Sequence, residues 1–102
     1  MFKHRTYERV VCSDGFSISI QAGYGKYSSP KFESLTGYTS VELGYPNRPC
    51  PFIYKYAESS HDYTDTVYPY VPSKVVDAMI KAHGGIVSGE CPLLDFDYKT
   101  LP

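Results

Sequence analysis

Strict alternation of apolar and polar residues over residues 16–22 is the feature that most constrains how this chain can fold. The apolar positions are Phe16, Ile18, Ile20 and Ala22, and the polar positions between them are Ser17, Ser19 and Gln21. A period of two residues is typical of a β-strand with one buried face. Asp14 and Gly15 precede this segment, and glycine tolerates the positive φ that short hairpin loops require. The sequence therefore predicts a hairpin whose first strand lies within residues 6–12.

Further strands are expected at residues 38–45, 52–57 and 66–71, and a short last strand at Ile86 and Val87. Alternation in each of the first three would place certain residues on a shared face. These groups are Thr39, Val41, Leu43 and Tyr45; Tyr54 and Tyr56; and Tyr68 and Tyr70. Because Pro69 has no N–H to donate to a ladder, residues 66–71 are expected to form either an edge strand or a strand that ends in an extended arm.

One helix is expected after these strands. Ser73 would cap its N-terminus, Asp77 would pair with Lys81 one turn later, and Gly84 or Gly85 would end it. Its apolar stripe consists of Val75, Val76, Met79 and Ile80. Beyond it, three apolar residues of the tail could pack back on the domain as a lid: Leu93, Leu94 and Phe96.

About five strands and one helix in 102 residues predict a single α+β domain spanning residues 1–102. The helix follows the strands rather than alternating with them, which favours a small antiparallel sheet, a meander or partly closed roll, with the C-terminal helix packed on its apolar face.

Charge and cysteine content exclude several functions. Ten Lys and Arg against eleven Asp and Glu give a net charge of -1, so the chain lacks the basic surplus expected of a duplex-DNA binder. The three cysteines, Cys12, Cys50 and Cys91, form no CxxC pair, which favours free thiols in a reducing cytoplasm over a metal site. Residues 1–9 carry charge and no apolar segment, so no signal peptide and no membrane association are expected.

No short motif indicates an enzyme. Gly23-Tyr24-Gly25 is followed by neither a helix nor the third glycine of a phosphate-binding loop. The chain contains the residue types of a nucleophilic site, namely Cys12, Cys50, Cys91, His61, His83, Asp62 and Asp77. No nucleophile motif accompanies them, and His83 is explained as a cation at the helix C-terminus or as a surface group. We therefore expect a protein without enzymatic activity, cofactor or metal.

Tyrosine is the residue type from which we predict binding. The chain has 11 Tyr and 5 Phe but no Trp. Tyrosine suits half-buried strand positions, and it also contacts proteins and stacks on bases at low entropic cost. Because several tyrosines fall in loops or beside prolines, where core filling explains them less well, a contact surface is predicted. Its candidate residues, with nearby cations, are Tyr24, Lys26, Tyr27, Tyr45, Arg48, Tyr54, Tyr56, Tyr68 and Tyr70.

Residues 7–22 (YERVVCSDGFSISIQA), 38–46 (YTSVELGYP) and 66–72 (TVYPYVP) resemble, in the same order, segments of small uncharacterised accessory proteins encoded by bacteriophages. The resemblance implies a phage or prophage gene expressed in the cytoplasm of an infected bacterium, and it transfers no activity. Small phage proteins of this kind often block host proteins, including those of bacterial immunity.

Three functions follow as hypotheses. The first is a binding protein that masks a host or defence protein with its tyrosine-rich surface and the loop at residues 23–30. The second is a homo-oligomer that sequesters a nucleotide-like ligand between Tyr and Lys or Arg. The third is a single-stranded nucleic-acid binder that uses the same aromatic residues.

Overall fold

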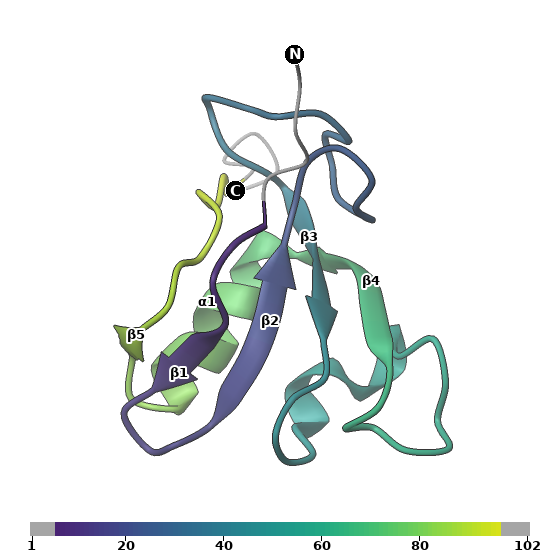
Figure 1. Ribbon diagram of the computed structural model, residues 1–102, viewed down its shortest axis with the longest axis vertical. Coiled ribbons are helices and arrows are strands. Elements are labelled where there is room, and N and C mark those ends of the chain that lie inside the picture. The colour runs from purple at the N-terminus through teal and green to yellow at the C-terminus, as the bar shows by residue number, and fades with distance from the viewer. Residues whose placement is uncertain (1–5, 97–102) are drawn as a thin grey trace, which may run out of the picture.

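A five-stranded antiparallel sheet and one α-helix make up the fold in a computed structural model that describes residues 6–96 (Figure 1). The elements, in chain order, are β1 (Val10–Cys12), β2 (Ser17–Gln21), β3 (Ser40–Gly44), the 3-10 helix η1 (Pro51–Tyr56), β4 (Val67–Pro72), α1 (Ser73–Ala82) and β5 (Ile86–Ser88). The predicted α+β class is confirmed.

The strands lie in the order β4-β3-β2-β1-β5. The first four strands form a meander, and α1 then carries the chain from the β4 edge to the opposite edge, where β5 pairs with β1. Ser17 and Ile18 of β2 pair with β1, whereas its later residues, Ser19 to Gln21, pair with β3. The strand β2 therefore joins two halves of the sheet, and β4 lies at an edge, as predicted.

The hairpin and the buried face of β2 are as predicted. The Asp14 Oδ1 atom accepts the Phe16 N–H at 2.9 Å, and Gly15 has φ 91°. The four alternating apolar residues of this segment are fully buried: Phe16, Ile18, Ile20 and Ala22. This face therefore forms part of the hydrophobic core.

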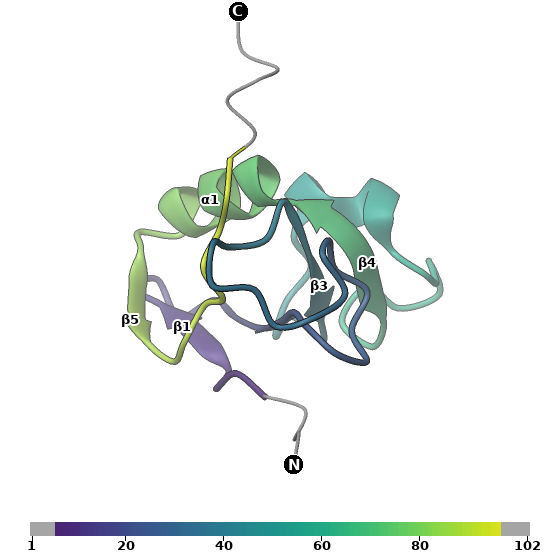
Figure 2. The same cartoon turned by 90° about the horizontal axis from the view of Figure 1, so that it is seen from above.

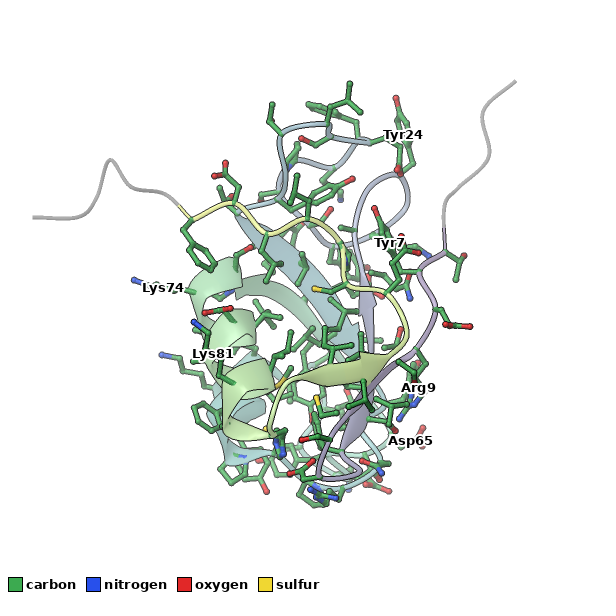
Figure 3. All side chains as sticks on the ribbon, turned by 90° about the vertical axis from the view of Figure 1, so that its left-hand side faces the viewer. Tyr7, Arg9, Tyr24, Asp65, Lys74 and Lys81 are labelled. Atoms are coloured by element: carbon green, nitrogen blue, oxygen red, sulfur yellow. The ribbon has the colours of Figure 1, made fainter. Side chains whose placement is uncertain are left out.

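The helix α1 covers the core with Val76 and Met79, while Val75 and Ile80 are partly buried. It lies on the same side of the sheet as η1 (Figure 2). Two cations on it, Lys74 and Lys81, extend away from the sheet (Figure 3). The predicted pair of Asp77 and Lys81 is confirmed, with 2.8 Å between Oδ2 and Nζ.

The predicted capping role of Ser73 is wrong. Pro72 occupies the N-cap position of α1, and no side chain caps the helix there. The Ser73 hydroxyl instead donates to the backbone carbonyl of Tyr38. Since β4 runs directly into α1, Ser73 is already the first helical residue.

The strand predicted at residues 52–57 is a 3-10 helix instead. Pro51 stands at its start, the Ile53 N–H donates to the Cys50 carbonyl, and the Ala57 N–H donates to the Tyr54 carbonyl. The even-numbered aromatic residues suggested a strand, but Ile53 is the fully buried residue. One helical turn is enough to place this isoleucine in the core.

The burial of the residues that flank β3 also differs from the prediction. Val41 and Leu43 are fully buried, whereas Thr39 and Tyr45 are exposed. The strand ends at Gly44, and Tyr45 has φ 53°. The chain thus leaves the sheet before Tyr45 can continue the buried face.

The tail after the confirmed strand β5 packs back on the domain only in part. Leu94 forms a parallel bridge with Tyr38 and packs against the core, and Phe96 is half-buried. Leu93 is exposed, so the predicted lid does not include it.

Candidate functional site

Tyr70 stands in a β-bulge at the free edge of the sheet. Between two matched pairs, β3 advances two residues, from Val41 to Leu43, while β4 advances three, from Tyr68 to Val71. Tyr70 has φ 54°, a left-handed conformation that costs a residue with a Cβ roughly 1–2 kcal/mol. A bulge redirects the side chain it carries, and Tyr70 is exposed while Val71 is fully buried.

This bulge also overturns the prediction that Tyr68 and Tyr70 share a face. Tyr68 is fully buried, and its hydroxyl donates to the backbone carbonyl of Tyr63. Burial raises the pKa of Tyr68 to about 12. Tyr68 therefore belongs to the core, and the structure removes it from the predicted binding surface.

The ring of Tyr27 lies beside that of Tyr70. The Tyr70 N–H donates to the Tyr27 carbonyl at 3.1 Å, and the Tyr27 N–H donates to Oε1 of Glu42 on β3 at 2.9 Å. The two ring centroids are 5.8 Å apart with an interplanar angle of 46°, within the range of favourable aromatic pairs. Two residues distant in sequence are thus held as one exposed pair.

Lys31 places a positive charge over this pair. Its Nζ atom lies 5.4 Å from the ring centroid of Tyr27 and 6.0 Å from that of Tyr70, distances at which an ammonium is attracted to an aromatic face. We refer to Tyr27, Lys31 and Tyr70 as the aromatic–lysine cluster. Lys31 was not among the predicted residues, because nothing in the local sequence relates it to Tyr70.

The loop that carries the cluster is anchored to the rest of the fold at several points. Ser28 is fully buried, and its hydroxyl donates to the Pro30 carbonyl and accepts the Gly23 N–H. Backbone hydrogen bonds join Ser29 to Thr39 and to Ser40. These contacts fix Tyr27 and Lys31 relative to the sheet.

Tyr24 and Lys26 belong to the same loop, Tyr24 exposed and Lys26 half-buried. Tyr24 lies at the end of the molecule opposite Asp65 (Figure 3). The structure therefore places four of the predicted binding residues in or beside one region: Tyr24, Lys26, Tyr27 and Tyr70.

The other predicted residues lie elsewhere. Tyr45 is exposed after β3, where its carbonyl accepts a hydrogen bond from Arg9. Tyr54 stacks on Tyr63 with 3.9 Å between centroids, and Tyr56 is half-buried under the Lys55 ammonium. These tyrosines do not extend the aromatic–lysine cluster.

Arg48, the remaining predicted residue, lies in a second group of interacting side chains at the turn of the β1–β2 hairpin. One Asp14 oxygen, Oδ2, accepts hydrogen bonds from Arg48 at 2.9 Å and from Nδ1 of His83 at 2.7 Å. The imidazole stacks on Phe16 with 4.0 Å between ring centroids and 9° between planes. Its other nitrogen, Nε2, lies 3.8 Å from Sγ of Cys50.

The hydrogen bond to Asp14 fixes which ring nitrogen of His83 carries a proton. The hydrogen bonds from His83 and from the Phe16 N–H hold the pKa of Asp14 below its ordinary value of 3.8. An ionised carboxylate can only accept, so Nδ1 of His83 carries a proton, and in the neutral imidazole the Nε2 lone pair faces Cys50. Burial raises the pKa of the Cys50 thiol, although the Phe52 N–H and the charge of Arg48 act to lower it.

Sequence reasoning counted Cys50 and His83 among the residue types available for nucleophilic chemistry but omitted Asp14, which it used only in the turn. Asp14 and His83 are 69 residues apart and Cys50 and His83 are 33 apart. Only the sheet topology brings them together, so no local motif could have identified them.

Within residues 6–96, no three His, Cys, Asp or Glu side chains are grouped so that they could hold a metal ion. Cys12, Cys50 and Cys91 are free thiols. Over the same residues, no helix is long and apolar enough to span a bilayer.

Comparisons with known proteins identify no relative: no family model, curated protein sequence or solved structure matches this chain.

Proposed function

We propose that this protein acts as a binding protein, a phage accessory factor that blocks a host or bacterial-immunity protein in the cytoplasm of an infected cell. Its contact surface is centred on the aromatic–lysine cluster and extends over the anchored loop at residues 23–37. The observation that carries this proposal is the exposed pair of Tyr27 and Tyr70, held in place from two separate parts of the chain.

Exposure and residue type support this surface. Tyr27 is 44% exposed, Tyr70 is 42% exposed and Phe32 on the same loop is 53% exposed. Tyrosine is enriched among the residues that dominate binding energy at protein interfaces. Its large ring carries few rotatable bonds, so little conformational entropy is lost on binding.

The fixed geometry of the cluster supports it further. The loop bonds that hold Tyr27 and the bulge that directs Tyr70 order both rings before a partner arrives. Preorganisation lowers the entropic cost of association. A left-handed tyrosine at a sheet edge is also the kind of local backbone strain that clusters at functional sites. A glycine at this position would adopt the same backbone conformation without the strain.

Affinity capture of the tagged protein from an infected bacterial lysate tests this function, with retained proteins and nucleotides scored together. A host protein retained in near-equal molar amount to the bait is the expected result. Recovery of neither a protein nor a nucleotide would refute the proposal.

A nucleotide-like ligand is the second candidate, favoured by the position of Lys31. An ammonium next to two tyrosine rings offers a phosphate partner beside a stacking surface for a base. Sequestration of this kind predicts that the captured material is a nucleotide without a stoichiometric protein. Native mass spectrometry of the purified protein would then show a bound ligand, in a homo-oligomer if subunits share the site.

Single-stranded nucleic acid is a weaker candidate, because such binders combine stacking aromatics with a positively charged groove. In the described part of the loop, Lys26 and Lys31 are accompanied by Glu33, and Glu42 hydrogen-bonds Tyr27. The local charge is balanced, so the electrostatic term that drives strand binding is small.

A further inference from the structure

Cys50, His83 and Asp14 form an ordered thiol–imidazole–carboxylate chain. Sγ of Cys50 is 3.8 Å from Nε2, and Nδ1 on the other side of the ring is 2.7 Å from the Asp14 carboxylate. Because the carboxylate fixes the proton on Nδ1, the Nε2 lone pair of the neutral ring is directed at the thiol. This is the arrangement in which a histidine acts as general base for a nucleophile.

Three neighbours hold the chain in this arrangement. The Phe16 ring stacks on the imidazole, Arg48 binds the same Asp14 oxygen, and the Phe52 backbone N–H donates to the Cys50 sulfur. The last contact and the charge of Arg48 both favour negative charge on that sulfur. Burial opposes them and keeps the thiol protonated at rest, so attack requires a base beside it.

Access to Cys50 comes from the segment in which it lies. Cys50 is 2% exposed, but its neighbours at positions 47–49 and 51–52 are exposed. Cys50 is thus a residue of the hydrophobic core that is carried by an otherwise exposed segment. His83 lies at the surface as well, with 16% of its side chain exposed.

Cys12 provides a matched comparison inside the same molecule. It is also 2% exposed, and burial raises the pKa of its thiol as well. Within residues 6–96, the structure gives Cys12 no histidine partner, and the nearby Asp14 charge raises the pKa further. The two thiols are thus equally covered, and of the two only Cys50 has an imidazole beside it.

We propose that Cys50 is a nucleophile that takes an acyl group from an ester, with His83 as its base and Asp14 as the positioning residue for His83. As Sγ attacks the carbonyl carbon, the thiol proton moves to Nε2. When the tetrahedral intermediate collapses, the carbon–oxygen bond to the leaving alcohol breaks. That proton passes to the leaving oxygen, and an acyl thioester remains on Cys50. This activity is independent of the aromatic–lysine cluster.

Acetylation of the folded wild-type protein by p-nitrophenyl acetate tests the proposal. Peptide mass spectrometry follows acetyl groups on Cys50 and Cys12 over time, and neutral hydroxylamine releases those held as thioesters. Because a positioned base contributes roughly 100-fold or more to such steps, acetylation of Cys50 should be about 100-fold faster than that of Cys12. Equal rates at the two cysteines would overturn the proposal.

His83→Asn isolates the base, because the asparagine amide can still donate to Asp14 while the nitrogen beside Cys50 is lost. In the folded variant, checked by circular dichroism, Cys50 should acetylate no faster than Cys12. A folded variant that keeps the fast rate would overturn the role of His83. If the variant does not fold, the comparison of the two cysteines in the wild type still decides the question.

Asp14→Asn and Asp14→Glu test the positioning residue through the pH dependence of Cys50 acetylation. The asparagine variant should lose the fast rate across the pH range, and the glutamate variant should recover part of it. An asparagine variant with the wild-type pH profile would contradict the role of Asp14.

Discussion

Because the backbone of Tyr70 is left-handed, we predict that glycine is more stable than alanine at this position, the reverse of their usual order. Both Tyr70→Gly and Tyr70→Ala remove the exposed ring, so the loss of its contacts cancels between them. The conformational free energy of the backbone does not cancel between the two variants, because Tyr70 has φ 54° and only glycine adopts that region without a Cβ penalty.

The magnitude follows from two opposing terms. Alanine at a left-handed position costs roughly 1–2 kcal/mol, while glycine loses about 0.5–1 kcal/mol more backbone entropy on folding than alanine does. Tyr70→Gly should therefore be more stable than Tyr70→Ala by about 0.5–1 kcal/mol. At Val87, an exposed position of β5 whose φ is not positive, alanine should be the more stable by about 0.5–1 kcal/mol.

Urea unfolding of the four variants measures both differences. With an unchanged m-value in the range of about 1–3 kcal/mol/M, each difference is a shift of roughly 0.5 M in the midpoint, in opposite directions at the two positions. If alanine is the more stable residue at Tyr70 as well, the bulge does not hold this residue in a left-handed conformation. The argument that the sheet edge is bent to present its ring then fails.

Four other outcomes are expected. Gly85→Ala should cost about 0.5–1 kcal/mol, because the penalty for alanine at its φ of 89° exceeds the backbone entropy that glycine loses on folding. Gly89→Ala should cost about 3 kcal/mol or more by thermal unfolding, because its Cβ would also lie 2.0 Å from a backbone oxygen; equal losses would contradict this contact. Tyr68→Phe should lower the unfolding free energy by about 1 kcal/mol, since its hydroxyl donates to a backbone carbonyl. The pKa of Asp14 is lowered mainly by the hydrogen bond from His83, so this carboxylate stabilises the fold above its ordinary pKa and ceases to do so as the pH falls through the folded value. The stability difference between wild type and Asp14→Asn should therefore shrink in urea titrations from about pH 5 to about pH 2, and a constant difference would contradict the assignment.

The elements predicted correctly are those whose pattern is local. The alternation from Phe16 to Ala22 and the stripe of α1 follow from which side chains can be buried together in a strand or a helix. Pro69 indicated an edge strand because a missing N–H has the same consequence in any fold.

The predictions were wrong where the chain departs from the two-residue alternation of a regular strand. The bulge in β4 adds a residue between Tyr68 and Val71, which sends Tyr68 into the core and Tyr70 outward, and tyrosine gives no sequence sign of a positive φ. At Pro51–Tyr56 the aromatic spacing imitated a strand, whereas burial of Ile53 was achieved by a helical turn.

The candidate sites were predictable only in part for the same reason. Tyr27 and Tyr70 were both predicted as contact residues, but the contact between them and the position of Lys31 depend on how the loop docks along β4. Likewise, Asp14 and His83 meet because α1 returns the chain to the β1 edge.

The most direct test of the central claim compares Tyr27→Ser with Phe52→Ser as baits in capture from the infected lysate. The two side chains are similarly exposed, at 44% and 50%, but Tyr27 lies in the loop region at one end of the molecule and Phe52 on η1 at the other (Figure 1). Loss of the Tyr27 ring should weaken binding of the captured partner by about tenfold or more, while Phe52→Ser binds as the wild type does. Full binding by Tyr27→Ser, or a loss confined to Phe52→Ser, would contradict the assignment of the contact surface.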